Sequence, residues 1–211
     1  MAKLKSTLLN MLLSLTIICL AAGAILAGVN MYTTGPIAAS KAAALQNAIR
    51  QVVPEFDNNP TEEAYKAPTS EGDSLTIYPA MKDGKFVGAA VESNTKKGFG
   101  GEIKVIAGFD PQGKLINYSV LQHSETPGLG SKMQEWFRTD KNKQSIIGRS
   151  LSNGGLSVTK DGGDVDAITA ATISSRAFLD AVNRAYSAYK GGADSTSGAT
   201  TKIKEEEGGD K

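Results

Sequence analysis

The longest apolar run in the chain lies close to its start. Residues 8–29 read LLNMLLSLTIICLAAGAILAGV and carry no charged side chain. A helix of about 20 apolar residues crosses a hydrocarbon core of about 30 Å, so this run predicts one transmembrane helix. A cleaved signal peptide is the alternative, although its apolar region is usually only about 7 to 15 residues long. Lys3 and Lys5 precede the run, and the positive-inside rule therefore predicts a cytoplasmic N-terminus over residues 1–7 and an extracytoplasmic remainder.

A helical spacing of apolar residues returns after this span. Pro36 suits the first turn of such a helix, and the apolar positions that follow are Ala38, Ala42, Leu45, Ile49 and Val52. Residues 58–73 are rich in turn formers and charge, which predicts a loop. Residues 30–72 are therefore interpreted as a membrane-proximal helix and loop.

The next part of the chain follows β patterns. Two runs flank the turn pair Asp83-Gly84, and two more flank the turn DPQG, as in a pair of hairpins. Four antiparallel strands are predicted, over residues 74–81, 85–93, 102–109 and 114–122. Residues 131–148 then predict an amphipathic helix with Trp136 and Phe137, followed by a polar connection.

A second helical pattern ends the folded part. It begins near residues 169–172 and stops before Gly191, with one apolar face made of Ile173, Ala177, Ala181, Val182, Ala185, Tyr186 and Tyr189. Residues 191–211 contain too few apolar side chains to form a core and predict a disordered tail. The fold class is thus α+β, an antiparallel sheet with packed helices over residues 73–190, preceded by one N-terminal transmembrane helix.

The composition of the chain excludes several kinds of binding site and cofactor. The 211 residues have a formal net charge of +1, which argues against a nucleic-acid partner. One cysteine and one histidine exclude an intramolecular disulfide and a cysteine-rich iron–sulfur site, and no metal site is expected. Any electron chemistry must therefore come from an organic cofactor or from a partner.

Four hydroxyl side chains gather at the start of the last helix: Thr169, Thr172, Ser174 and Ser175. The N–H groups and dipole of a helix N-terminus favour an anion, and hydroxyl donors suit a phosphate. Ordinary capping with spare surface hydroxyls explains the same residues. The pattern alone leaves both interpretations open.

Residues 166–172, Asp-Ala-Ile-Thr-Ala-Ala-Thr, resemble the flavinylation motif of the FMN-binding domain family. That motif is an Asp, two free positions, Ser or Thr, then Gly, Ala and Thr. In the family, a Mg-dependent flavin transferase takes FMN from FAD and joins its phosphate to the last threonine. The resemblance implies covalent FMN on Thr172, with Thr169, Ser174 and Ser175 beside the cofactor and Asp166 and Ala171 recognised by the transferase.

A second signature of the same family is HSETPGLGSKM, residues 123–133, from which the resemblance places Glu125, Thr126 and Leu129 beside the flavin. Both motifs, their order, the Gly98-Phe99-Gly100-Gly101 turn and the N-terminal span resemble the G subunits of Rnf ion-translocating electron transport complexes. This implies an electron-carrying subunit of a redox-driven translocase (EC 7 class), in the bacterial inner membrane with its FMN domain outside the cytoplasm. Other Rnf subunits would be its partners and would bind NAD and ferredoxin. Electron transfer would be coupled to Na⁺ or H⁺ translocation, with no catalytic residue in this chain.

Three alternatives remain open. The C subunit of Na⁺-translocating NADH:quinone reductase shares the motifs. A membrane-tethered module that binds a free phosphorylated ligand would also use a hydroxyl-rich helix start. A purely structural assembly subunit would carry no chromophore.

Two details of the motif raise questions. Ala170 replaces the usual glycine and loses its freedom to adopt positive φ, so either the backbone there is ordinary or the transferase tolerates a methyl group. Residues 194–200, Asp-Ser-Thr-Ser-Gly-Ala-Thr, match the motif without substitution and offer Thr200 as a second acceptor. Thr172 is favoured because it begins a buried helix.

Overall fold

The computed structural model describes residues 7–69, 72–152 and 154–206, with side chains described as far as residue 191. Lys3, Lys5 and most of the predicted cytoplasmic segment 1–7 lie outside the described residues, as does the end of the predicted tail, 207–211. The chain divides into two compact units, Met1–Ala44 and Leu45–Lys211. The other predicted domain boundaries stay predictions.

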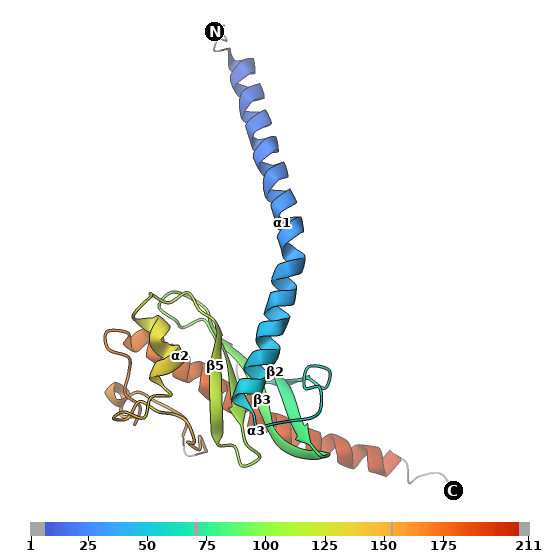
Figure 1. Ribbon diagram of the computed structural model, residues 1–211, viewed down its shortest axis with the longest axis vertical. Helices are drawn as coiled ribbons and strands as arrows, with labels where there is room; N and C mark the ends of the chain where they lie inside the picture. Colours follow the sequence, from blue (N-terminus) through green and yellow to red (C-terminus); the bar gives the residue numbers. More distant parts are fainter. Residues whose placement is uncertain (1–6, 70–71, 153, 207–211) are drawn as a thin grey trace. The chain divides into compact units, whose positions relative to one another are not determined.

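Helix α1, Leu8–Val52, is one continuous helix (Figure 1). It is long and apolar enough to cross a membrane, and none of its most apolar stretch is buried. The prediction of a separate helix beginning at Pro36 is wrong, because Pro36 lies inside α1. The proline removes one N–H donor, while the hydroxyls of Thr33 and Thr34 bond back to the carbonyls of Val29 and Asn30 at 2.9 and 2.6 Å.

The sheet has five antiparallel strands in sequential order, β1-β2-β3-β4-β5. They are β1 (Tyr65–Pro68), β2 (Ser74–Lys82), β3 (Lys85–Thr95), β4 (Ile103–Phe109) and β5 (Leu115–Gln122). The α+β class and the four predicted strands are confirmed, with ends shifted by two residues at most. The hairpin turns fall at Asp83-Gly84 and within DPQG, as predicted.

Strand β1 lies in the segment that we predicted to be a loop. Its register pairs Tyr65 with Ile77 and Pro68 with Ser74. Only Ala67 of its four residues is buried, so the strand is too short to show an apolar alternation. Pro68 cannot donate to the ladder and is therefore confined to an edge strand such as this one.

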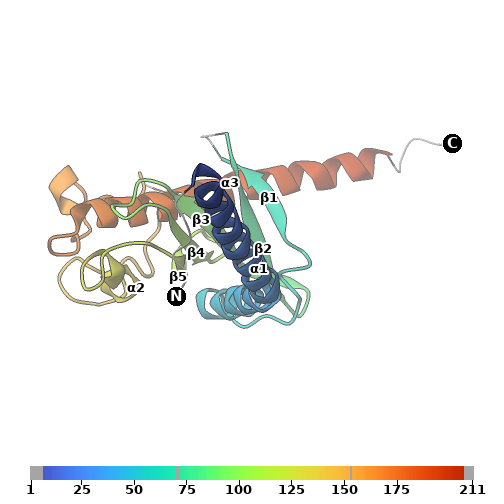
Figure 2. The same ribbon diagram turned by 90° about the horizontal axis from the view of Figure 1, so that it is seen from above.

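Helix α3, Thr172–Glu206, crosses one face of the sheet (Figure 2). Its core contacts include Phe178, whose ring stacks on Phe137 at 4.7 Å and meets Tyr118 edge-on at 4.8 Å. The predicted apolar face is confirmed except at Ile173, which is 50% exposed. The predicted end before Gly191 is wrong, since a glycine inside a helix costs only about 1 kcal/mol relative to alanine and does not by itself stop one.

The opposite face of the sheet is covered by the last turns of α1. Ala48, Ile49 and Val52 pack there in a cluster with Tyr78, Ala80, Ala90 and Ile106. A Cβ on Gly108 would lie 1.8 Å from the Val52 carbonyl oxygen, so only glycine permits this approach of helix end to strand. The sheet is therefore enclosed between the end of α1 and α3.

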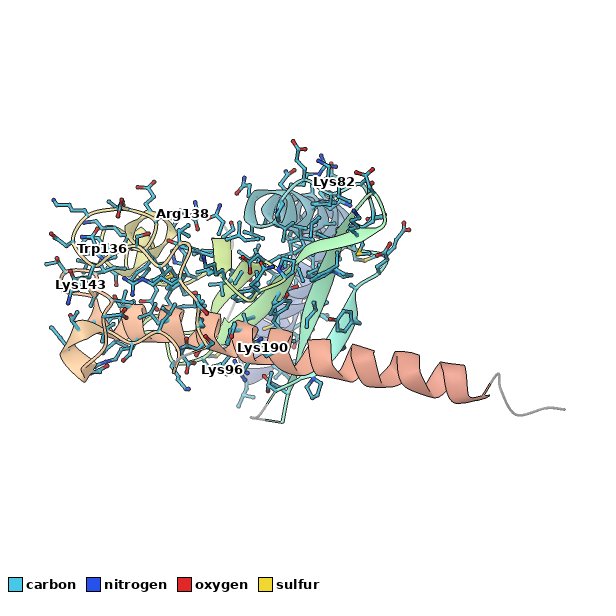
Figure 3. The ribbon with its side chains drawn as sticks, turned by 90° about the horizontal axis from the view of Figure 1, so that it is seen from below. Lys82, Lys96, Trp136, Arg138, Lys143 and Lys190 are labelled. Carbon is cyan, nitrogen blue, oxygen red and sulfur yellow. The ribbon has the colours of Figure 1, made fainter. Side chains whose placement is uncertain are left out.

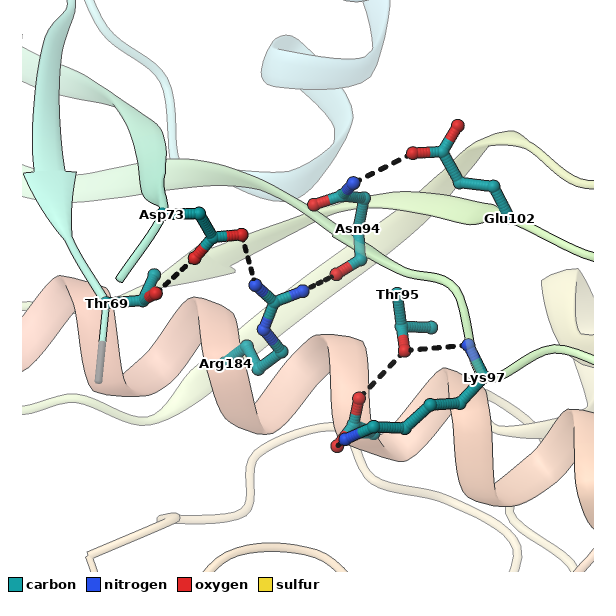
Figure 4. A network of polar contacts seen from close by, with 8 residues as sticks. Thr69, Asp73, Asn94, Thr95, Lys97, Glu102 and Arg184 are labelled. Carbon is teal, nitrogen blue, oxygen red and sulfur yellow. Dashed lines mark hydrogen bonds and ion pairs between the residues drawn. The ribbon is translucent and has the colours of Figure 1, made fainter. Parts of the chain in front are cut away.

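A polar network links α3 to the end of β1, the start of β2 and the end of β3 (Figure 4). Arg184 donates to the Asn94 carbonyl oxygen and pairs with Asp73, which also accepts the Thr69 hydroxyl. One turn before it, Asp180 accepts the Thr95 hydroxyl and the Lys97 ammonium, both at 2.8 Å. These contacts fix the position of α3 along the sheet.

The segment after β5 contains η1 (Gly130–Lys132) and α2 (Met133–Trp136), a shorter helix than predicted. It closes the β5 edge with side chains, because Gln134 accepts the Val120 N–H at 2.8 Å and Arg138 donates to the Tyr118 carbonyl oxygen. Figure 3 shows Trp136 and Arg138 at the α2 end of the domain, away from Lys82 in the β2–β3 hairpin. Polar side chains of α2 and its flanking residues thus form hydrogen bonds with backbone groups that are normally exposed at the edge of a sheet.

Candidate functional site

A cavity of about 360 Å³ opens at the start of α3. Its lining brings together three segments distant in sequence: the 98–101 turn, the segment before η1 and the first turn of α3. The predicted residues Thr126, Leu129, Thr172 and Ser174 all line it, and the other lining residues are Phe99, Gly130, Ala170, Ala171 and Ile173. This volume is within the range of small-molecule sites, about 300 to 1,000 Å³.

The backbone before α3 forms a tight turn that presents Thr172. The Ala171 N–H donates to the Ile168 carbonyl oxygen at 3.0 Å, and Ile168 is buried in the core. Ala170 lies at the third position of this turn with φ +60°. Positive φ there is typical of a type II turn and favours glycine, so the backbone at Ala170 is not ordinary.

Glu125 lies behind the cavity and joins two of its walls. Its buried carboxylate accepts the Ser174 hydroxyl through Oε2 and the Gly100 N–H through Oε1, the latter at 2.9 Å. A Cβ on Gly130 would lie 2.7 Å from Glu125 Oε2 and 2.5 Å from Ser174 Oγ, so a side chain there would break this contact. Glu125 is therefore a support for the walls and does not itself line the cavity.

The remaining predicted residues have other contacts. Ser175 is fully buried, and its hydroxyl accepts the Ile168 N–H and donates to the Ala171 carbonyl oxygen, both at 2.9 Å. Asp166 accepts the Lys143 N–H on its carboxylate and the Trp136 indole N–H on its backbone carbonyl. Thr169 is exposed, and Ala171 is buried at the cavity wall. Ser175 and Asp166 thus fix the turn, and Ser175 does not face the cavity.

Apolar side chains remain accessible around the cavity mouth. Phe99 is 70% exposed, Ile173 50% and Leu129 39%. Phe99 was not among the predicted site residues, although its setting, Gly-Phe-Gly-Gly, is the signal that identifies it. These three side chains offer an apolar, partly aromatic surface to a ligand ring.

The electrostatics at Thr172 favour an anion. The first turn of α3 contains no acidic residue of its own, and the positive end of the helix dipole lies at this turn. The Lys160 ammonium, in η2 (Thr159–Asp161), donates to Thr172 Oγ1 at 3.3 Å. Sequence reasoning missed Lys160 because only the fold brings it to the helix start. A ligand with an apolar ring and a phosphate fits this arrangement.

Comparisons with known proteins place the chain in one family. Residues 98–187 match the family model described as FMN-binding domain. The chain is 33% identical over 189 residues to the G subunit of the ion-translocating oxidoreductase complex of Aliivibrio fischeri, covering 84% of this chain and 88% of that protein. It is 34% identical over 182 residues to the Shewanella oneidensis protein of the same name, covering 82% and 85%. It is 35% identical over 165 residues to the Haemophilus influenzae protein of the same name, which covers 75% of this chain and 78% of that protein.

Proposed function

Because the chain belongs to the family of G subunits of ion-translocating oxidoreductase complexes, with an FMN-binding domain, we propose that it relays electrons through FMN joined by a phosphoester to Thr172. The complex would be of the Rnf type, and electron transfer would be coupled to Na⁺ or H⁺ translocation. The observation that carries this proposal is one cavity lined by Thr172, Thr126 and Leu129, residues from two separate sequence signatures.

The residues around the cavity fit the two ends of FMN. Phe99, Leu129 and Ile173 offer apolar surface for the isoalloxazine ring, and Thr172 with the α3 N-terminus suits the phosphate. FMN, when bound, supplies one- and two-electron chemistry. The protein contributes the attachment point, the apolar walls and their support by Glu125, which together set the exposure and orientation of the ring.

Topology and partners form the second part of the proposal. Helix α1 would cross the bacterial inner membrane once, with the FMN domain on the extracytoplasmic side. Other proteins of the complex would donate and accept the electrons, and a flavin transferase would act on residues 166–172 during maturation. A covalent link would retain the cofactor where lost FMN could not easily be replaced.

The test is in-gel fluorescence of the full chain co-expressed with its flavin transferase. We expect the denatured wild-type band to fluoresce under ultraviolet light, Thr172→Ala to abolish the signal and Thr200→Ala to leave it unchanged. The two variants are matched because both remove a threonine from a copy of the same sequence motif. Mass spectrometry of the peptide that contains Thr172 would confirm the added FMN.

Other outcomes distinguish the alternatives. A chromophore that denaturation releases would support a free phosphorylated ligand, and a colourless purified protein would support a structural role. Full fluorescence in Thr172→Ala would contradict the proposed attachment site. Loss of signal in Thr200→Ala alone would move the site to the second motif.

A further inference from the structure

The Lys160–Thr172 contact is held by an ion pair between neighbouring residues. Arg176, four residues after Thr172 on α3, binds Asp161, the residue after Lys160, with Nε–Oδ2 at 2.7 Å and Nη2–Oδ1 at 2.5 Å. Hydrogen bonding from Arg176 lowers the pKa of Asp161, and the carboxylate is charged at neutral pH. A bidentate pair fixes orientation as well as distance.

Backbone bonds close the segment that carries Lys160. The Thr159 N–H donates to the Val165 carbonyl oxygen at 2.8 Å, and the Val165 N–H donates to the Ser157 carbonyl oxygen at 3.1 Å. The Asp161 N–H returns to the Val158 carbonyl oxygen at 2.9 Å, and Val158 and Val165 are both buried. The turn is therefore anchored in the core, and the long Lys160 side chain extends from it to the start of α3.

An ammonium donor at Thr172 Oγ1 has a defined chemical consequence. A lysine can only donate, so its hydrogen bond favours an oxygen that carries negative charge. Phosphoryl transfer to that oxygen builds charge on the oxygens around phosphorus, and fixed positive groups stabilise it. The Lys160 side chain is exposed, and its ammonium lies 3.3 Å from the oxygen to which a phosphate would be bonded.

We propose that Lys160 promotes the attachment of FMN to Thr172 by contacting the Thr172 oxygen and neutralising the phosphate that is transferred to it. This inference rests on the proposed function. In the step, Thr172 Oγ forms a bond to the FMN phosphorus of FAD, and the bond from that phosphorus to the AMP oxygen breaks. AMP leaves, the hydroxyl proton passes to solvent or to a base of the transferase, and no electron is exchanged. After transfer, Lys160 pairs with the single negative charge of the phosphodiester.

The experiment measures the attachment rate on the full chain in detergent, purified without flavin and mixed with purified transferase, FAD and Mg²⁺. Fluorescence of the denatured band and release of AMP are followed together. We expect Lys160→Gln to slow both by roughly tenfold to a hundredfold, the usual effect of losing a charge-assisted hydrogen bond. Lys160→Arg should restore most of the rate, and Lys85→Gln, at an exposed lysine of the β2–β3 hairpin, should match wild type.

Salt separates a charge effect from a structural one. Screening weakens exposed charge interactions, so the gap between wild type and Lys160→Gln should narrow as the salt concentration rises. A gap that is independent of salt, with no rescue by arginine, would overturn the proposed charge role. Attachment to Lys160→Gln at the wild-type rate would overturn the inference alone, whereas a wild-type chain that is never labelled would overturn covalent attachment as well.

Discussion

At the scale of single residues, Ala170 connects sequence, backbone and site. It keeps the positive φ, +60°, that a glycine would adopt without strain. A non-glycine residue in the left-handed region costs about 1 to 2 kcal/mol. Ala170 therefore holds a backbone conformation that favours glycine, and this turn places Thr172 at the cavity.

Replacing Ala170 tests this strain directly. Ala170→Gly should raise the free energy of unfolding by up to about 1 kcal/mol, because relief of strain exceeds the entropy gained by the unfolded chain. Thermal unfolding of the full chain in detergent measures the change, and Ala170→Val should lower the melting temperature. If glycine destabilised the protein, the strain would not be real.

Ser174 offers a comparison of two buried serines. Ser174→Ala removes one of the hydrogen-bond donors to the buried Glu125 carboxylate and should cost about 1 to 3 kcal/mol of unfolding free energy. Ser93 is also fully buried, but its hydroxyl has no hydrogen-bond partner within the part of the chain that the structure describes, so Ser93→Ala should cost much less. Equal losses in chemical denaturation would contradict the supporting role of Glu125.

Phe99 and Phe86 are both exposed phenylalanines, but only Phe99 lines the cavity. Phe99→Ala should shift the flavin absorption band and increase quenching of flavin fluorescence by iodide, since one wall of the ring site is lost. Phe86→Ala in the β2–β3 hairpin should leave both measurements unchanged. An unaltered spectrum and quenching constant in Phe99→Ala would place the ring elsewhere.

At the scale of elements, Asp73 makes the link between α3 and the β1–β2 hairpin sensitive to pH. Hydrogen bonds from Thr69 and then Arg184 lower the pKa of Asp73 below its ordinary value of 3.8. A lowered folded-state pKa contributes stability that is present above the unfolded value and lost as the pH falls through the folded one.

Asp73→Asn should therefore lower the melting temperature at neutral pH, and the deficit should shrink as the pH falls through the lowered pKa of Asp73, below which the carboxylate is protonated in both states. Asp140→Asn, at an exposed carboxylate in the connection after α2, provides the matched control and should change little. A deficit that stayed constant with pH would mean that the Asp73 charge does not contribute.

The elements that the sequence predicts well are those with a long periodic pattern. Four strands and the helix after Thr172 follow from apolar spacing and turn residues. Strand β1 has one buried residue and could not be recognised, and Pro36 suggested a helix start although it lies inside the continuous helix α1. In the site, the motifs identify Thr172, Thr126 and Leu129, whereas Lys160 comes beside Thr172 only through the fold.

At the scale of the whole molecule, the proposed topology places the domain outside the cytoplasm. In a Cys19→Ser background, Lys141→Cys should react with an impermeant maleimide in cells with a permeabilised outer membrane, because Lys141 is exposed. Lys5→Cys should react only after lysis. The reverse pattern would place the FMN domain in the cytoplasm.

The edges of the sheet also limit how other proteins can bind. Strand addition needs a free row of backbone N–H and C=O groups, but at β5 the Val120 N–H and the Tyr118 carbonyl are occupied by Gln134 and Arg138. At the other edge, β1 has four residues and ends in Pro68. Neighbouring proteins of the complex are therefore expected to recognise this domain through side chains, so that its contacts can be released and remade without extending or breaking a β-ladder.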